Sequence, residues 1–585
     1  MTFPTSISGE SIPAESAAGD AWRRRLMIAM LMLMAAVILF YNLGDCRTLG
    51  SHEVYAAVPA REMLASGNWI VPRFGGLPRL EKPPLSYWVV AASSRLFGRV
   101  DEWSVRFPAA VSALMLSALM GVWAGRWYGR AAGMGAALVQ FTSVYVMIFA
   151  RKAEVDMLLC LLTTSALFLI AGHQSDESPR RARLRWIGIY CLLSLAWLAK
   201  FHYGLAMVLG PCVVYFLIQR RYRSLGHLAN PVGLAIFMAS VLIWPYLLLQ
   251  QVPEAWQVWR WETVGRAVGE LGQQPFWFYI PHLLWLSLPW TPLAIAAIPA
   301  SWRQAWRAAD ARERFLWVWL LTVLAIVTIS ADKHKHYLIA ALPVFSLLAG
   351  QRFALLARRV REGQPLLNVR GAVILSVVCW AMAAFIFSNM TQKWPHLSTP
   401  LVTVGLILGL GGSAFIWLLT ARKVTAAQYV AIFAFLGCYL GVTGWILPGR
   451  DHRLPAAQFA RKIRHDVSSQ REVGVYRMGM TAVVYYLGDP VYRLESAQAV
   501  NEQVTRRQQL LLVTYEPMTD ELSQFGRLRI VRQLDTHPST QPPKHPPLVL
   551  VELTSPSMIA DSSEQSQHPS NRSSIDSQRT TLLAQ

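Results

Sequence analysis

Residues 46–86 read CRTLGSHEVYAAVPAREMLASGNWIVPRFGGLPRLEKPPLS and directly follow the first long apolar run of the chain, residues 26–43. This segment is too polar to cross a bilayer and too long to be a simple turn. It contains acids, bases and a proline pair at Pro83 and Pro84. We therefore expect an ordered surface segment that carries chemistry and is connected to membrane-spanning helices.

The composition indicates a membrane protein with several spans. Of its 585 residues, 54% are hydrophobic and 15% are charged, and the apolar residues gather in runs near bilayer length. Residues 132–150, 205–218 and 316–330 are apolar around nearly the whole helix, whereas a soluble amphipathic helix has one apolar face. Lipid or other helices must surround these runs.

The net charge of +21 raises the question of nucleic acid binding. The Lys and Arg residues fall mostly in short connections between apolar runs, and the positive-inside rule explains that placement better than a nucleic-acid interface does. The six cysteines are scattered, five of them within apolar runs, without a CxxC pair or a metal-ligand spacing. They argue against a disulfide framework.

The apolar runs predict a polytopic α-helical protein with about 13 membrane-spanning helices. Basic clusters fall on alternate connections, which places those connections and the N-terminal tail in the cytoplasm and makes residues 45–104 the first outer loop. The odd number of spans then places the C-terminal part outside the cytoplasmic membrane. The predicted spans are centred near residues 35, 115, 141, 163, 193, 211, 239, 290, 323, 346, 380, 410 and 437.

After the last span the sequence changes character. Strand-like and helical runs alternate and predict a small extracytoplasmic α/β domain, followed by a tail rich in Ser and Gln that we expect to be disordered. The strand-like runs are residues 473–476, 510–514, 528–531 and 548–553, and the helical runs are residues 456–465 and 496–506. The predicted regions are a tail (1–25), a membrane domain (26–448), the α/β domain (449–553) and the second tail (554–585).

Ionisable residues recur at the outer ends of the predicted spans, in residues 151–156, at Lys200 with His202, and in residues 332–336. Charges at membrane depth are costly, so they usually face a cavity or a partner. The alternative is that each one caps a helix at the interface or binds a phospholipid headgroup. Their recurrence at three connections and in the first loop favours one shared site.

The residue types of this site suggest its chemistry. Acids occur together with an excess of bases, which suits a substrate that carries phosphate and a reaction that needs a carboxylate base. A sugar linked to a lipid phosphate meets both conditions, because the cations would also stabilise the leaving phosphate. The acids are Glu53, Glu81 and Asp156, and the bases are Arg61, Lys82, Arg151, Lys200, Lys333 and Lys335.

The first outer loop resembles that of the protein O-mannosyltransferase-like membrane glycosyltransferases, especially the aminoarabinose transferases that modify lipid A. The shared motifs fall at Glu53, Tyr55-Ala56, Arg61-Glu62-Met63, Gly67-Asn68-Trp69 with Pro72, and Glu81-Lys82-Pro83-Pro84. Further motifs follow in the family's order at Val105-Arg106-Phe107-Pro108, residues 151–156, Lys200 with Gly204, Pro289-Trp290, and residues 333–337 before Leu342-Pro343.

The resemblance implies a GT-C fold and an inverting transfer at the outer face, without a nucleotide, from a sugar on polyprenyl phosphate. The sugar would be a pentose, aminoarabinose or a hexose such as mannose, and the acceptor a lipid A-like glycolipid, a protein or a glycan. The protein would act as a monomer among membrane lipids. The resemblance also implies an essential acid at the position before Glu53 or at Glu53, a second acid within residues 151–156, and a divalent metal ion held by Glu81 and a later His.

Two positions depart from the family's pattern. His52 stands where relatives have the first acid of the Asp-Glu pair, so base duty would fall to Glu53, to Asp156 or to His52 itself. Residues 261–266 contain no His, which leaves Glu81 with Glu262 as the alternative metal ligand. The predicted catalytic residues are Glu53, Asp156 and His52, and the predicted phosphate ligands are Lys82, Arg61, Arg151, Lys200, Lys333, Lys335, His336 and Tyr337.

Two other functions remain open at this point. A polytopic lipid or sugar transporter would more often show two similar halves and broken helices that meet near the midplane. The sequence shows no convincing internal repeat, and its charges gather at one face, so the enzyme is favoured. A catalytically impaired protein of the same fold is the other alternative, because His52 replaces an acid.

Overall fold

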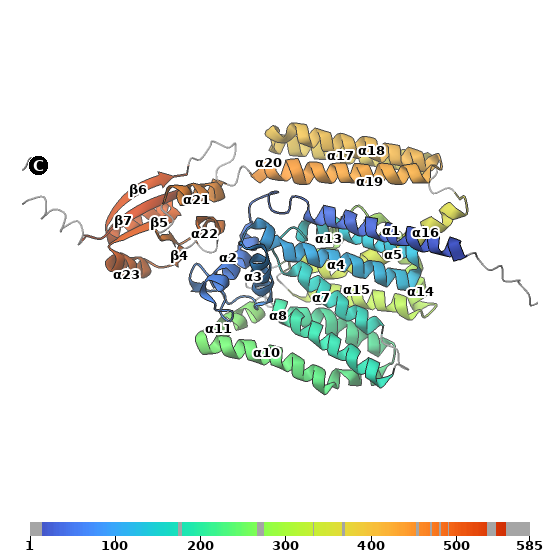
Figure 1. Ribbon diagram of the computed structural model, residues 1–585, viewed down its shortest axis with the longest axis horizontal. Helices are drawn as coiled ribbons and strands as arrows, with labels where there is room; N and C mark the ends of the chain where they lie inside the picture. Colours follow the sequence, from blue (N-terminus) through green and yellow to red (C-terminus); the bar gives the residue numbers. More distant parts are fainter. Residues whose placement is uncertain are drawn as a thin grey trace, which may run out of the picture. The chain divides into compact units, whose positions relative to one another are not determined.

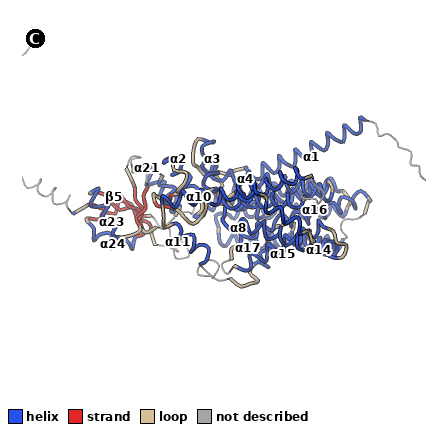
Figure 2. The backbone as a smooth tube through the Cα atoms, turned by 90° about the horizontal axis from the view of Figure 1, so that it is seen from below, coloured by secondary structure: helices blue, strands red, loops and turns tan. Residues whose placement is uncertain are grey.

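The computed structural model describes residues 14–172, 178–265, 274–330, 333–364, 369–451, 455–467, 471–478, 481–488, 491–534 and 546–556. The chain divides into two compact units, one of residues 1–74 and 78–453 and one of residues 75–77 and 454–585. Figure 1 labels the elements, and Figure 2 shows that the first unit is helical apart from very short strands. Residues 557–585 of the predicted disordered tail lie outside the described part.

The first unit contains the predicted membrane domain. Its helices begin and end as follows: α1 (Ala14–Phe40), α2 (Ser51–Ser66), α3 (Leu85–Phe97), α4 (Glu102–Tyr128), α5 (Arg130–Thr142), α6 (Val144–Phe149), α7 (Asp156–Ala171), α8 (Pro179–Ile218), α9 (Tyr222–Leu225), α10 (Pro231–Gln251), α11 (Ala255–Arg260), α13 (Tyr279–Leu286), α14 (Thr291–Trp306), α15 (Ala311–Ile329), α16 (Leu342–Arg361), α17 (Val369–Lys393), α18 (Ser398–Thr420), α19 (Val424–Gly441) and α20 (Leu447–Asp451). Short 3₁₀ or π turns connect some of them: η1 (Gly226–Ala229), η2 (Trp261–Gly265), η3 (Lys335–Ala341), η4 (Pro395–Leu397) and η5 (Val442–Ile446).

Seven helical segments among the described residues are long and apolar enough to cross a membrane. Two shorter apolar helices, Arg25–Phe40 and Asp156–Ala171, accompany them. Helices α4, α5, α7, α8, α14, α15 and α16 form a continuous buried core, whereas α17, α18 and α19 pack mainly on one another. The spanning segments, for example α10, have wide apolar surfaces. A lipid environment requires such surfaces.

Interruptions divide some of the apolar runs that the sequence presents as single spans. The run centred near residue 141 is two helices, α5 and α6, because Ser143 is extended and the amide of Val144 donates to the carbonyl of Leu288 at 3.0 Å. Position 290 falls between α13 and α14, where Pro289 and Pro292 limit helix formation. These interruptions depend on prolines and on a contact between distant segments.

The two predicted spans near residues 193 and 211 form one element, α8, with a sharp break at Lys200 and Phe201. A Cβ added at Gly204 would lie 2.4 Å from the carbonyl oxygen of Ala196. In a straight helix these two residues would be about 12 Å apart along the axis. The chain therefore reverses at the break, and only glycine at position 204 allows the two arms to approach so closely.

Helix α1 begins at Ala14, well before the predicted start of the first span near residue 26. Residues 14–22 read AESAAGDAW, and their alanines favour helix strongly enough to extend it into a polar region. The sequence prediction placed the boundary at Arg25 because it followed hydrophobicity alone. Helix α1 therefore combines an apolar segment with a more polar N-terminal extension.

The first loop is ordered, as its composition suggested. It contains α2 and the two-residue strands β1 (Arg73–Phe74) and β2 (Leu77–Pro78). Helix α2 ends at Ser66, and Gly67, with a positive φ of 70°, closes it in a left-handed cap. Helix α3 then begins directly after the Pro83-Pro84 pair.

The second unit contains a five-stranded sheet in the order β4-β3-β5-β7-β6. Strand β3 pairs in parallel with β4 and β5, while β7 runs antiparallel to β5 and β6. The strands are β3 (Val473–Tyr476), β4 (Val491–Leu494), β5 (Gln509–Tyr515), β6 (Arg527–Gln533) and β7 (Leu548–Thr554). The helices are α21 (Pro455–Asp466), α22 (Ala482–Leu487), α23 (Ala497–Arg507) and α24 (Thr519–Leu522), with the short turns η6 (Glu516–Met518) and η7 (Ser523–Phe525).

Candidate functional site

Glu53 lies in the first turn of α2 and is the centre of a buried ion-pair network. Its carboxylate is 2% exposed. Oε1 accepts a hydrogen bond from Nε of Arg106 at 2.8 Å, and Oε2 is paired with Arg47. The backbone amides of Gly50 and Ala153 also donate to it, at 2.9 and 3.2 Å. This carboxylate therefore joins the first loop to α4 and to the connection before α7.

The two arginines keep Glu53 ionised. Burial acts to raise the pKa of this carboxyl, but the charges and hydrogen bonds of Arg106 and Arg47 outweigh burial and lower the pKa to about 2. Both carboxylate oxygens already accept charge-assisted hydrogen bonds. Glu53 is therefore a weak proton acceptor, and its geometry suits a structural role.

Arg106, near the start of α4, is fully buried. Besides pairing with Glu53, it donates to the carbonyls of Leu43 at 2.9 Å, Arg47 at 3.0 Å and Thr48 at 3.1 Å. Three backbone carbonyls of the segment after α1 thus bind the guanidinium group of Arg106. The sequence identified Arg106 only as part of a family motif, and its one independent signal was a charge inside an apolar helix.

Arg151, a predicted phosphate ligand, is bonded elsewhere in the structure. Its guanidinium donates to the hydroxyl of Tyr439 at 2.8 Å and to the carbonyl of Asn42 at 2.7 Å. Asn42 in turn donates to the carbonyl of Thr443 at 2.9 Å. These bonds connect the end of α1 and the connection before α7 to α19 and η5. Arg151 therefore belongs with Glu53 in one structural network.

Asp156 begins α7 and is the second buried carboxylate, at 7% exposed. Lys200 donates to its Oδ1 at 2.8 Å. The Lys200 ammonium also lies 5.0 Å from the ring centroid of Tyr203 and 4.7 Å from that of Tyr337, where cation–π attraction holds it. The positive end of the α7 dipole further favours the Asp156 charge.

The break in α8 is what directs Lys200 to Asp156. Phe201, immediately after it, has a φ of 42° and a ψ of −140°, a conformation that a residue other than glycine adopts only at a cost of about 1–3 kcal/mol. Such strain persists only where the surroundings enforce it. The position of the Lys200 ammonium therefore depends on what packs around Phe201.

Lys82 is the third member of this group. It follows the hairpin of the first loop and lies directly before the Pro-Pro pair that opens α3. Burial and the nearby charge of Lys200 lower the pKa of its ammonium to about 8, although Asp156 acts to raise it. Lys82, Lys200 and Asp156 are therefore electrostatic neighbours, although they come from three separate segments.

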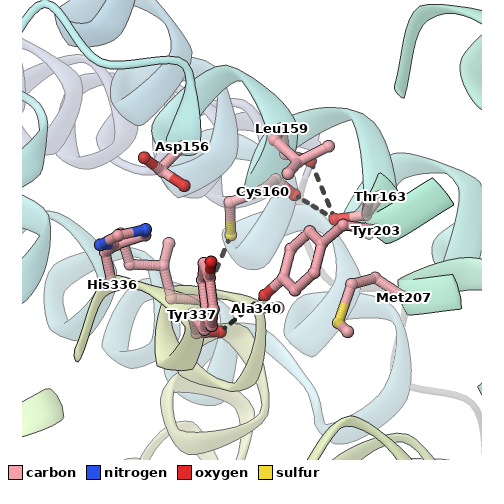
Figure 3. Close-up of a pocket in the computed structure, with 10 residues that line it drawn as sticks. Asp156, Leu159, Cys160, Thr163, Tyr203, Met207, His336, Tyr337 and Ala340 are labelled. Atoms are coloured by element: carbon pink, nitrogen blue, oxygen red, sulfur yellow. Dashed lines mark hydrogen bonds between the residues drawn. The ribbon is translucent and has the colours of Figure 1, made fainter. Parts of the chain in front are cut away.

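A small pocket opens beside Asp156 (Figure 3). Asp156 and His336 lie at one end, Thr163 and Met207 lie at the other, and the rings of Tyr203 and Tyr337 lie between them. The Tyr203 hydroxyl donates to the Tyr337 carbonyl at 3.1 Å. The remaining lining residues are Leu159, Cys160, Ile339 and Ala340. The pocket thus places a carboxylate and an imidazole at one end of its lining.

His52 is exposed in the first turn of α2, with its ring centroid 5.5 Å from that of Tyr55. Partial desolvation lowers its pKa, Glu154 acts to raise the pKa, and the charges of Lys82 and Lys152 act to lower it. His52 is therefore neutral near pH 7 and shares the neighbouring charge of Lys82 with Asp156. His336, by contrast, stacks on His334 with ring centroids 5.2 Å apart.

The other predicted phosphate ligands are more distant or bonded elsewhere. Lys333 is buried and donates to the carbonyl of Gln274 at 3.1 Å. Lys335 is exposed at the start of η3, and Arg61 lies more than two turns after His52 along α2. The structure therefore brings together Asp156, Lys200, Lys82, His336 and Tyr337 from the predicted set.

The resemblance implied a divalent metal ion at Glu81. In the structure Nη1 of Arg79 lies 3.7 Å from the Glu81 carboxylate. Throughout the described ranges, no group of three or more His, Cys, Asp or Glu side chains is arranged to hold a metal ion. A divalent ion needs several such ligands. The described residues therefore do not fit a resident ion at Glu81.

Comparisons with known proteins agree with the fold and the motifs. The family model described as dolichyl-phosphate-mannose-protein mannosyltransferase matches residues 81–246. An undecaprenyl phosphate-α-4-amino-4-deoxy-L-arabinose arabinosyl transferase of Pseudomonas savastanoi is 31% identical over 376 residues, which are 62% of this chain and 67% of that protein. The protein of the same name from Pseudomonas aeruginosa PAO1 is 30% identical over 67% of this chain and 71% of its own length.

A solved structure shares the fold. The crystal structure of ArnT from Cupriavidus metallidurans bound to undecaprenyl phosphate matches with a TM-score of 0.72 over 90% of this chain and 97% of that one, at 22% identity. The sequence identity to the two Pseudomonas proteins extends over two thirds or more of their length. The chain therefore belongs to the family of the undecaprenyl phosphate-α-4-amino-4-deoxy-L-arabinose arabinosyl transferases and is a multi-pass membrane glycosyltransferase of the GT-C fold.

Proposed function

We propose that this enzyme holds the phosphate of a polyprenyl-phosphate sugar between Lys82 and Lys200 and uses Asp156 as the general base. One observation carries the proposal. The buried Asp156 carboxylate lies 2.8 Å from the Lys200 ammonium and is an electrostatic neighbour of Lys82. Two lysines supply phosphate recognition and stabilisation of the leaving group, and the carboxylate supplies proton transfer.

The reaction follows from these roles. The acceptor hydroxyl attacks C1 of the sugar while Asp156 takes its proton. The bond between C1 and the phosphate oxygen breaks, its electron pair leaves with that oxygen, and the two ammonium groups stabilise the charge that develops there. Attack from the face opposite the phosphate inverts the configuration at C1. Because the phosphate carries the leaving electron pair, the transfer needs no nucleotide.

Donor binding also prepares the base. In the ligand-free arrangement Lys200 donates to Asp156, and this hydrogen bond stabilises the carboxylate and weakens it as a proton acceptor. A bound phosphate competes for the same ammonium. Asp156 therefore becomes more basic once the donor is in place, so proton transfer follows donor binding.

Family membership supports the choice of donor. The names of the relatives specify 4-amino-4-deoxy-L-arabinose on undecaprenyl phosphate, and an undecaprenyl-phosphate-linked pentose of this kind is the donor we propose to test first. The acceptor would be a hydroxyl of a lipid A-like glycolipid, a protein or a glycan. His52, where relatives have an acid, would remain neutral beside the donor.

The site also fits a membrane topology. We place it at the outer face of the cytoplasmic membrane, with the N-terminus in the cytoplasm and the α/β unit outside, and we retain about 13 spans for the complete membrane domain. The donor's polyprenyl chain would lie among the helices, and the protein would act as a monomer. Labelling of a cysteine introduced at Gly76, from outside intact spheroplasts, tests the orientation of the first loop.

The decisive experiment is sugar transfer by the purified protein from synthetic undecaprenyl-phosphate aminoarabinose. Asp156→Asn should lower kcat by about 10²- to 10⁴-fold, the usual contribution of a general base, while binding of undecaprenyl phosphate persists. Glu254→Gln, at an exposed acid before α11, is the control and should keep wild-type turnover. Full turnover by Asp156→Asn in the same assay would remove Asp156 from the mechanism.

A further inference from the structure

Four aromatic side chains form one cluster beside the candidate site: Trp197 and Phe201 from α8, Trp244 from α10 and Trp259 from α11. The ring centroid of Phe201 lies 5.3 Å from that of Trp197, 6.3 Å from that of Trp244 and 5.8 Å from that of Trp259. Trp244 and Trp259 are 5.7 Å apart. Three helices thus meet around the strained residue after Lys200.

The same cluster holds the first loop through its indole groups. Trp244 Nε1 donates to the carbonyl of Ile70 at 3.1 Å, and Trp259 Nε1 donates to the carbonyl of Leu80 at 2.9 Å. Ile70 precedes the β1–β2 hairpin and Leu80 follows it. The segments before and after the hairpin are therefore held on α10 and α11, and the second bond lies two residues before Lys82.

These contacts bear on both lysines of the proposed phosphate site. The rings of Trp244 and Trp259 pack on Phe201 and so enforce the break that aims Lys200 at Asp156. The Trp259 N–H holds the backbone two residues before Lys82, and the Trp244 N–H holds Ile70 on the other side of the hairpin. One cluster therefore determines how far apart two ammonium groups from different segments lie.

We propose that this aromatic cluster is a positioning device that sets the spacing of Lys82 and Lys200 for the donor phosphate, with Trp259 as its main positioning residue. The inference rests on the proposed function, because the spacing matters only if the two lysines share one phosphate. Trp259 touches no reacting atom. It acts through the carbonyl of Leu80, and its loss leaves that buried acceptor unpaired.

Trp259→Phe is the sharpest test, because it removes the indole N–H while it keeps a ring against Phe201. Trp256→Phe is the matched control on the same helix, since Trp256 is 62% exposed. We expect Trp259→Phe to weaken binding of undecaprenyl phosphate about tenfold and to raise KM for the donor similarly, with kcat changed less than threefold. Trp244→Phe should act in the same direction, and Trp256→Phe should bind as wild type.

A double-mutant cycle separates positioning from general loosening of the fold. If Trp259 acts through Lys82, Trp259→Phe should weaken binding in the wild-type background and have little further effect in the Lys82→Ala background. Equal, additive losses in both backgrounds would contradict positioning, as would wild-type binding by Trp259→Phe while Lys82→Ala binds weakly. Wild-type binding by Lys82→Ala would instead overturn the proposed phosphate site. The two failures are therefore distinguishable.

Discussion

Glu53 and Asp156 are both buried carboxylates next to outer connections, and both are paired with cations, yet their surroundings differ. Glu53 is held by two arginines and two backbone amides. Asp156 has one lysine at 2.8 Å and lines a pocket with His336. Both oxygens of Glu53 already accept hydrogen bonds. The lysine that pairs with Asp156 can instead bind a phosphate.

The difference shows how the type of cation separates a structural carboxylate from a reactive one. A guanidinium is permanently charged, presents a rigid fork of donors, and in Arg106 is bonded to backbone carbonyls as well. An ammonium is a compact charge on a flexible stem that can change partners. A carboxylate that is paired with arginines therefore stays ionised and keeps its partners. A carboxylate that is paired with a lysine can lose that partner to a ligand.

The largest expected effect comes from removing the charge of Glu53. Glu53→Gln leaves the buried Arg106 without its counter-charge, and we expect the free energy of unfolding to fall by about 3–5 kcal/mol. Asp156→Asn should lower it less, because the freed Lys200 ammonium still lies over the rings of Tyr203 and Tyr337. Thermal unfolding of the purified variants in detergent measures both. Equal destabilisation by the two variants would contradict the distinction between the sites.

A smaller effect is expected on the binding of undecaprenyl phosphate, which should depend on the protonation state of Lys82. Its pKa of about 8 means that the ammonium is charged below pH 8 and loses its proton as the pH rises further. A phosphate monoester, with its second pKa near 6, keeps a constant charge over that range. Binding of undecaprenyl phosphate should therefore be strongest below pH 8 and weaken by up to about tenfold per pH unit above it.

Lys82→Arg provides the control for this pH dependence, because a guanidinium stays protonated throughout. Its binding curve should be flat between pH 7 and 9.5, whatever its absolute affinity. The measurement is a titration of the purified protein with undecaprenyl phosphate at each pH. Identical slopes for wild type and Lys82→Arg would assign the titration to another group.

The smallest expected effect concerns Arg151 and sharpens the boundary between the two sites. Tyr439→Phe removes one neutral partner of Arg151 and should cost about 1 kcal/mol of stability. Binding of undecaprenyl phosphate should not change if Arg151 is structural. Tyr429→Phe, an exposed tyrosine on the same helix, is the control. A change in binding for Tyr439→Phe but not for Tyr429→Phe would indicate that Arg151 contributes to the phosphate site.

The sequence predicted best those secondary-structure elements that local sequence patterns determine. The strand-like runs at residues 473–476 and 548–553 coincide with β3 and β7, and the helical run at residues 496–506 with α23, because alternation and amphipathic spacing are local properties. Strand β4 was not predicted, since its four residues lie at the sheet edge and only one of them is buried. Short edge strands carry little hydrophobic pattern.

The candidate site was predictable in composition but less so in its pairing. The motif with Lys82, the acid at Asp156 and the interruption at Lys200 all stood out as charges in an apolar context. Which cation faces which acid depends on long-range contacts, such as Arg106 with Glu53 across 53 positions. The tryptophans that hold the first loop had no signal of their own, because tryptophan is common throughout this chain.

The reversal within α8 also constrains how the chain enters the membrane during synthesis. Its two arms are joined without a loop, and Gly204 lies against the backbone of Ala196. Two spans joined in this way enter the bilayer together as a hairpin, since no loop separates them. In the proposed topology the tip that crosses first carries Lys200 and His202. Added charge at this tip would therefore reduce the yield of inserted protein before it altered any kinetic constant.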